Sequence, residues 1–193
     1  MKYTGVGSRE IPRDKYDILA DYAEALALAG YTARSGAADG ADSAIEEGAD
    51  RGNGTKEIYL PWRGFNDSKS ALCGVASDAL KIAATVHPAW AALSDAAKKL
   101  HGRNVYQVLG RNLSEPSDFV LCWTKDGLEL EKNRTSKSGG TATAIVLGLR
   151  NNIPVFNLGA AGSLARLNAF LLARGIKVPP HKEAPVLTQS GLF

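Results

Sequence analysis

Residues 32 to 48 read TARSGAADGADSAIEEG and carry the clearest fold signal in the chain. The stretch begins as a short β-prone run, passes through small residues, and continues as a helical pattern that Gly52 and Gly54 end. A strand that turns through glycine into a helix is the repeating unit of α/β proteins. Bare backbone beside acidic residues also indicates a place that a ligand can approach closely.

The same alternation of strand and helix continues on both sides of this stretch. The strands are short and β-prone or strongly apolar, and the helices place apolar residues at intervals of three and four. Strands are predicted at residues 2–8, 31–35, 56–62, 117–124 and 153–158, and helices at 16–30, 41–52, 139–151 and 163–175. We therefore predict an α/β fold, a Rossmann-like parallel sheet with helices on both faces.

Between the third and fourth predicted strands the pattern is helical only. We predict a helical insertion over about residues 66–113, with a break near Ser94 or Gly102. A length of 193 residues favours a single domain, which we place at residues 1–178. The tail is rich in proline, so residues 179–193 are predicted to form an irregular C-terminal arm.

Composition and charge are those of an ordinary globular protein. Hydrophobic residues make up 45% of the chain, and the net charge of +3 comes from scattered basic residues, so nucleic acid is not the expected partner. The three histidines are widely separated and the two cysteines form no CxxC pair, so we expect no metal site and no resident cofactor. Reduced thiols and the lack of a long apolar segment predict a cytoplasmic protein without a membrane partner.

Three turns rich in small residues, at 5–9, 35–42 and 136–144, follow predicted strands or open a predicted helix. The carboxyl ends of parallel strands meet at one edge of a sheet, where helix N-termini favour anions, so we expect the turns to converge there. The strongest is Gly139 to Thr141, whose bare amides open an apolar helix and suit a phosphate. The ligand-binding candidates in these turns are Gly7, Ser8, Arg9, Ser35, Gly36, Asp39, Gly40, Asp42, Ser138, Gly139, Gly140 and Thr141.

None of the three turns is a complete nucleotide-binding fingerprint. The GxGxxG pattern would need glycine where Glu10 stands, and the SGGT turn lacks the lysine of a GxxxxGKS/T phosphate loop. Gly5 and Gly7 also have a simpler explanation, because strand-to-helix turns use glycine for its backbone freedom alone. The turns therefore predict a class of ligand rather than a particular cofactor.

Charged residues near the turns have more than one role open to them. Asp39, Asp42 and Glu46 lie close to the start of the predicted helix, where a carboxylate can accept hydrogen bonds from ribose hydroxyls. Asp39 or Asp42 can instead cap that helix. Arg9 and Arg34 are the candidate cations for a phosphate group.

A later helical segment, residues 98–112, also presents polar side chains at regular spacing. His101, Asn104 and Gln107 recur on one face with Arg103 beside them, among apolar neighbours, and this pattern favours ligand recognition over a solvated face. Cleavage of a glycosidic bond would need an acid or a base. The candidate catalytic residues are Asp42, Glu46 and His101.

Six motifs follow one another along the chain, and they are Gly7-Ser8-Arg9, Ser35 to Asp42, Glu57 to Trp62, His87 to Trp90, Leu100 to Gly110, and Gly139 to Thr141. In this order they are similar to the motifs of the SLOG superfamily, in its YspA/YpsA-like, phage or bacterial type. The superfamily includes the LOG phosphoribohydrolases and the Rossmann-like domain of DprA. The resemblance implies a Rossmann-like fold, a nucleotide-derived ligand such as an ADP-ribose-like molecule, and self-association as a homodimer or tetramer.

One departure from the LOG pattern bears on function. LOG hydrolases resemble one another in a PGGxGTxxE loop, whereas this chain reads SGGTATAI and has no acid within a turn after Thr141. The resemblance therefore implies binding of an ADP-ribose-like or cyclic nucleotide signal by a sensor or sequestering protein, with phage counter-defence in the host cytoplasm as a sensible setting. The alternatives are a phosphoribohydrolase acting on nucleoside 5′-monophosphates and a DprA-like single-strand DNA binder.

Overall fold

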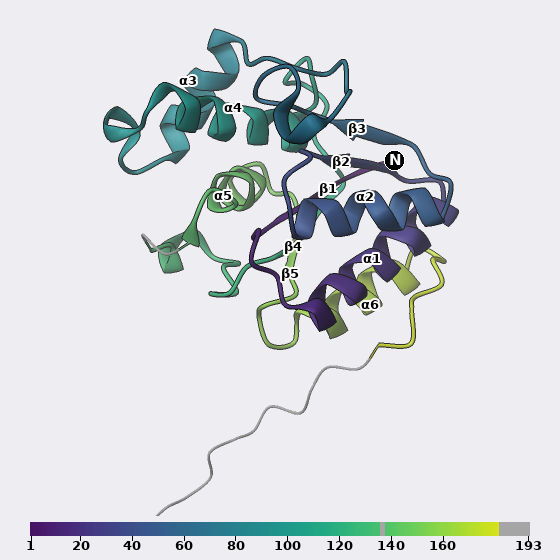
Figure 1. Ribbon diagram of the computed structural model, residues 1–193. Helices are drawn as coiled ribbons and strands as arrows, with labels where there is room; N and C mark the ends of the chain where they lie inside the picture. The colour runs from purple at the N-terminus through teal and green to yellow at the C-terminus, as the bar shows by residue number, and fades with distance from the viewer. Residues whose placement is uncertain (136–137, 182–193) are drawn as a thin grey trace, which may run out of the picture.

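The computed structural model describes residues 1–135 and 138–181, and its centre is a five-stranded parallel sheet (Figure 1). Every neighbouring pair of strands is parallel. From β1 the chain adds β2 and then β3 on one side of the sheet. It then crosses to the other side of β1 and adds β4 and β5, so the strand order reverses between β1 and β4. The strands, in the spatial order β3-β2-β1-β4-β5, are β1 (Lys2–Gly7), β2 (Thr32–Ser35), β3 (Lys56–Ile58), β4 (Phe119–Trp123) and β5 (Val155–Asn157).

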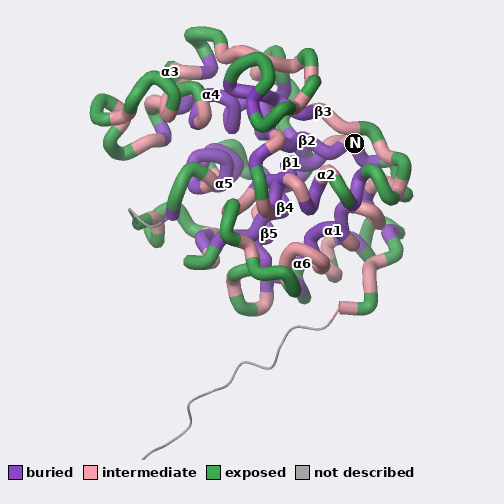
Figure 2. The backbone as a smooth tube through the Cα atoms, in the orientation of Figure 1, coloured by how far each residue is buried: buried purple, intermediate pink, exposed green. Residues whose placement is uncertain are grey.

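Helices cover both faces of the sheet, which confirms the predicted α/β Rossmann-like fold (Figure 1). Along β4 the side chains alternate, so Phe119 and Leu121 enter one core while Val120 and Cys122 enter the other. Strand β4 is buried along its whole length, as Figure 2 shows, and this explains its continuous apolar run FVLCW in the sequence. One face carries α1 (Arg13–Leu28), α2 (Ala41–Arg51) and α6 (Ser163–Leu172), and the other carries α3 (Ser77–Val86), α4 (Asp95–Leu109) and α5 (Ala142–Arg150).

The insertion between β3 and β4 consists of α3 and α4 and short 3-10 turns. Helix α4 begins at Ser94, whose side-chain oxygen accepts a hydrogen bond from the N–H of Ala97 at 3.3 Å, so the predicted break near Ser94 is confirmed. The alternative break at Gly102 is wrong, because α4 continues through it. A Cβ at Gly102 would lie 2.5 Å from the side chain of Val75, so glycine there allows a close approach.

Small residues bring α1 and α2 close together and α2 close to the sheet. A Cβ added to Gly48 would lie 2.0 Å from the carbonyl oxygen of Ala20, and one added to Gly5 would lie 2.6 Å from Ile45. Helix α2 therefore lies directly against α1 and β1, and its start is held beside the end of β1.

The described part of the chain ends at His181, whose Nε2 lies 2.7 Å from Oδ2 of Asp21 in α1. Most of the predicted C-terminal arm, residues 182–193, lies outside the described residues, so that prediction stays open. No helix within 1–135 and 138–181 has the length and apolar character needed to cross a bilayer.

Candidate functional site

A cavity of about 450 Å³ opens at the carboxyl ends of β1 and β4. This is the place where the strand order reverses, and ligands of open α/β sheets bind at such a point. All three predicted turns contribute to its lining. The turn at 35–42 contributes only Ala38 and Asp42. Most of the polar lining comes from four segments, which are Gly7 to Glu10, the inner face of α4, Thr124 to Asp126, and Ser138 to Thr141.

The turn into α5 supplies donors to this cavity. The N–H groups of Gly140, Thr141 and Ala142 donate to no acceptor in the described part of the chain. They are the unpaired donors of a helix N-terminus, and the aligned peptide dipoles add positive potential there. The cavity therefore contains a backbone site suited to an anion.

Ser138 fixes this turn. Its hydroxyl donates to Oδ2 of Asp126 at 2.6 Å and accepts from the N–H of Thr135 at 3.0 Å, while Thr124 donates to Oδ1 of Asp126 at 2.7 Å. Burial raises the pKa of Asp126, but these two hydroxyl donors outweigh it, so the net pKa lies below the ordinary value. The hydroxyl of Ser138 is thus used within the protein, and Asp126 ties the turn to the end of β4.

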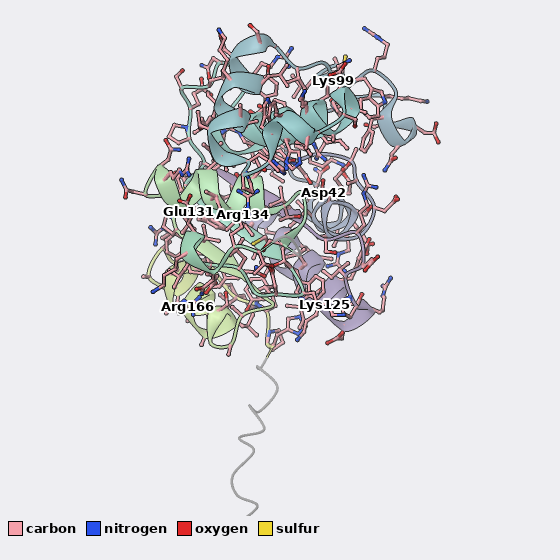
Figure 3. The ribbon with its side chains drawn as sticks, turned by 90° about the vertical axis from the view of Figure 1, so that its left-hand side faces the viewer. Asp42, Lys99, Lys125, Glu131, Arg134 and Arg166 are labelled. Atoms are coloured by element: carbon pink, nitrogen blue, oxygen red, sulfur yellow. The ribbon has the colours of Figure 1, made fainter. Side chains whose placement is uncertain are left out.

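Two exposed cations stand at the rim of the cavity. Arg9 and Lys125 line it, and neither has a carboxylate within ion-pair distance among the residues the structure describes. Figure 3 shows Lys125 and Asp42 on the same side of the molecule. Both cations are free to pair with an anionic ligand, with Glu10 and Asp126 beside them at the rim.

Arg34 lies elsewhere. Its side chain is fully buried, and Nε lies 2.7 Å from Oε2 of Glu57 while Nη2 lies 3.6 Å from Oε2 of Glu115. This second of the two cations predicted for a phosphate is instead part of an ion-pair network with Glu57, Glu115 and Lys2. Glu57 consequently has its pKa lowered to about 2, where hydrogen bonds from Lys2, Tyr59 and Arg34 outweigh the opposing effect of burial.

Arg103 is the cation that reaches the cavity from inside. Its Nη1 lies 3.0 Å from Oδ2 of Asp42, and the two side chains are 6% and 4% exposed. Burial raises the pKa of Asp42, and the guanidinium and the amides of Ala38 and Gly7 oppose that rise. The Nε of Arg103 is buried without a hydrogen-bond partner within the described chain.

The bare backbone at Gly36 accommodates this guanidinium. A Cβ at Gly36 would lie 1.1 Å from Nη1 of Arg103, so the predicted reason for glycine there, approach by a ligand, is wrong. Gly40 is needed for similar internal reasons, because its φ is +79° and an added Cβ would lie 2.6 Å from the carbonyl oxygen of Ser8. Small residues in this turn serve packing of the pocket wall.

The remaining predicted residues of this region stand away from the cavity. Ser35 is buried, Asp39 is exposed, and Glu46 is a half-buried residue of α2 whose pKa is raised by burial. Helix α2 has Gly40 at its N-cap and no side-chain cap, so capping by Asp39 or Asp42 does not occur. Asp42 alone among the three acids lines the cavity.

The polar face of α4 lines the cavity, but its side chains also hold the turn into α5. The Nδ2 of Asn104 donates to the carbonyl oxygen of Gly140 at 2.9 Å, and Nδ1 of His101 lies 2.8 Å from the hydroxyl of Thr143. Burial, with a smaller effect of the neighbouring His87, lowers the pKa of His101 to about 4. His101 is therefore a neutral imidazole near pH 7.

These positions limit what the site can do chemically. Asp42 is committed to Arg103, Glu46 lies outside the cavity, and His101 has a pKa too low for efficient proton abstraction near pH 7. The geometry offers donors and cations for an anion and no free acid–base pair among the three candidates. Sequence reasoning missed Glu10 and the segment Thr124 to Asp126, although the latter follows a predicted strand and the strand-end rule applies to it equally.

No protein-family model and no curated protein matches the chain. Solved structures that resemble it include the molybdenum cofactor carrier protein of Chlamydomonas reinhardtii, at 14% identity and a TM-score of 0.50, over 91% of this chain and 86% of that one. DNA processing protein A of Streptococcus pneumoniae resembles it at 17% identity and a TM-score of 0.51, over 92% of this chain. The chain spans 58% of that second protein. At these identities the likeness shows the Rossmann-like fold alone.

Proposed function

We propose that the protein binds a nucleotide-derived small molecule and holds a phosphate group of it at the start of α5. The observation that carries the proposal is the run of N–H groups at Gly140, Thr141 and Ala142, which have no acceptor among the described residues. These groups open into the same cavity as Arg9 and Lys125, two cations that have no ion-pair partner within 1–135 and 138–181. Backbone donors at a helix N-terminus together with cations favour a phosphate. Membership of the SLOG superfamily, in its YspA-like branch, is part of this proposal.

The size and lining of the cavity support a small ligand. A volume of about 450 Å³ lies within the range of sites for small molecules. One wall is the face of α4 with Ala97, Leu100 and the neutral ring of His101, against which the less polar part of a ligand can lie. The molybdenum cofactor carrier protein of Chlamydomonas reinhardtii is an example of a small-molecule carrier with this fold.

The role that we propose is binding rather than turnover. Such a protein would sense or sequester an ADP-ribose-like or cyclic nucleotide signal, with phage counter-defence as its setting and the cytoplasm as its location. The absence of a free acid–base pair among Asp42, Glu46 and His101 supports this reading over a phosphoribohydrolase. Gly139 and the loop Gly7 to Arg9 would form the rest of the ligand contact, while Ser138, predicted as a contact, would act by holding the turn.

The direct test is to denature purified protein and identify the released small molecules by mass spectrometry. We expect a phosphate-bearing nucleotide derivative, at a level that falls in a variant with both Arg9→Ala and Lys125→Ala. Protein freed of ligand should show a raised melting temperature with AMP, ADP-ribose or a cyclic nucleotide. No stabilisation by any phosphate-bearing nucleotide would refute the proposal.

Two other functions are separated by simple assays. Incubation with AMP derivatives, NAD and ADP-ribose followed by chromatography should return unchanged ligand, and release of a free base would make the protein a hydrolase. The likeness to DNA processing protein A favours a test of single-stranded DNA. We expect no gel shift at physiological salt, and a shift that persists there would favour nucleic-acid binding instead.

A further inference from the structure

We propose that Gln107 is a positioning residue that couples the two walls of the cavity, by joining the backbone of Gly36 to the turn at Gly140 through Asn104. This inference deepens the proposed function and rests on it for the ligand at α5. In this proposal the amide side chains of α4 fix the position of backbone groups on the two walls, in addition to any contact with the ligand.

The connection is a chain of hydrogen bonds. With the Gln107 amide oriented so that its oxygen faces donors, Oε1 accepts from the N–H of Gly36 at 3.0 Å and from Nη1 of Arg103 at 3.0 Å. Its Nε2 donates to Oδ1 of Asn104 at 2.9 Å, and Nδ2 of Asn104 donates to the carbonyl oxygen of Gly140 at 2.9 Å. One side-chain pair thus reaches from the end of β2 to the start of α5.

Burial makes these bonds specific. Gln107 is fully buried, and Arg103 and Asn104 are 5% and 8% exposed, so water cannot easily replace a lost partner. The primary amide offers an acceptor for Gly36 and Arg103 and a donor for Asn104 on one side chain, whereas an ionised carboxylate of the same length could only accept. The amide of Gln107 therefore fixes which group donates and which accepts in each hydrogen bond between Gly36 and Gly140.

The end of this chain lies at the proposed anion site. The carbonyl group of Gly140 and the N–H of Thr141 belong to one planar trans peptide and point in opposite directions. A side chain that holds the carbonyl oxygen of Gly140 therefore also sets the direction of the Thr141 N–H. Since Arg103 is fixed by the same Gln107 oxygen, the guanidinium and the backbone donor are positioned together.

The test uses the intact, isotope-labelled protein with Gln107→Met, which keeps the length of the side chain and removes all three hydrogen bonds of the amide. Inorganic phosphate is the ligand probe. We expect at least a tenfold faster exchange of the Gly36 N–H, a shifted amide resonance of Thr141 in the free protein, and a phosphate Kd about tenfold higher. Asn66→Met is the control, because Nδ2 of Asn66 donates to the carbonyl oxygen of Ala37 from the exposed side, and its residue is not part of the chain of hydrogen bonds to Gly140. It should leave Thr141 and the phosphate Kd unchanged.

The phosphate Kd of a double variant shows whether Gln107 and Asn104 act in series or as two independent contacts. If the amides act in series, Asn104→Leu combined with Gln107→Met should raise the phosphate Kd no more than the stronger single change. Effects on Kd that multiply, or a Thr141 resonance that does not move in Gln107→Met, would overturn the proposal. If Gln107→Met does not fold, Asn104→Ala tests the chain from its other end, with a change expected at the Gly36 N–H.

The two proposals fail in different ways. A wild-type protein that shows no phosphate binding at about 10 mM would refute the anion site, and the resonance of Thr141 in ligand-free Gln107→Met would still decide the coupling. Phosphate binding that is unaffected by Gln107→Met would keep the proposed function and remove the positioning role.

Discussion

At the scale of single residues, the cavity depends on side chains that reach it from distant parts of the sequence. Arg103 comes from α4, pairs with Asp42 of α2, and occupies the space that Gly36 leaves open in the turn after β2. Local patterns mark each of these positions as unusual without showing that they belong together. For that reason Gly36 was predicted to face a ligand, whereas its neighbour is a guanidinium of the same chain.

Gly36→Ala is expected to displace Arg103. The new Cβ would lie 1.1 Å from Nη1 and would force the guanidinium away from the buried carboxylate of Asp42. Breaking a buried pair costs about 3 kcal/mol, so the free energy of unfolding should fall by about that amount in urea titration. Gly140→Ala is the matched control, because the nearest heavy atom to its Cβ is Cε1 of His101 at 4.0 Å. An equal loss in both variants would contradict this explanation.

The rim cations should contribute to affinity rather than stability. Arg9→Ala and Lys125→Ala should each weaken binding of a phosphate-bearing ligand by about fivefold, since each removes one charge from the cavity edge. Isothermal titration at low and high salt would measure this, and the loss should shrink at high salt. Arg13→Ala is a suitable control, because Arg13 pairs with Asp17 outside the cavity.

The lowered pKa of His101 predicts how stability responds to pH. In the unfolded chain this imidazole takes up a proton near its ordinary pKa of 6.5, whereas in the folded chain it does so only near 4. The unfolded state therefore binds more protons in this interval, and the free energy of unfolding contributed by His101 falls as pH is lowered from 6.5 to 4. Denaturation of wild type and His101→Gln across this range isolates the effect. Parallel pH profiles would show that His101 is not its source.

At the scale of elements, the sequence predicts the helices and strands well because each has a local signature. The periodicities and glycine stops that mark α1, α2 and α6 depend only on neighbours in the chain. The reach of β3 was overestimated, since its pairing with β2 ends at Ile58 and Leu60 instead bridges to Cys73. Where a strand stops depends on what lies beside it, and that information is not local.

The contact between α1 and α2 should be sensitive to one methyl group. Gly48→Ala would place a Cβ 2.0 Å from the carbonyl oxygen of Ala20, a backbone atom that cannot move without shifting α1. We expect a loss of about 2 kcal/mol in the free energy of unfolding, despite the better helix propensity of alanine. Gly148→Ala in α5 is the comparison, because there the Cβ meets a side-chain methyl of Val120 at 3.0 Å. Gly148→Ala should lower the free energy of unfolding clearly less than Gly48→Ala does.

At the scale of the whole molecule, one topological rule accounts for most of the site that could be foreseen. The carboxyl ends of the strands share an edge, so Gly7, Ser8, Arg9 and the turn at 138–141 were predicted to meet, and they line one cavity. Arg34 was placed there by the same rule and lies instead in an ion-pair network, because the rule gives the position of a backbone and not the direction of a side chain.

Self-association remains a prediction at this scale. Two leucines near helix ends, Leu28 of α1 and Leu172 of α6, are 73% and 57% exposed. A homodimer or tetramer would be seen in light scattering as a solution mass two or four times that of one chain. A mass equal to one chain at micromolar concentration would contradict the expectation.

The reversal of strand order determines when, during synthesis of the chain, the cavity can form. One side of the cavity is made by residues 7–10 and the other by residues 124–126 and 138–141. A nascent polypeptide that has emerged only as far as β3 therefore contains one side of the cavity and lacks the other. Ligand capture can begin only when the chain has emerged as far as Thr141 and the turn into α5 has packed beside the end of β4. Occupancy by the ligand would then serve as a readout of finished folding, and a chain cut between β3 and β4 should regain it only when both fragments reassemble.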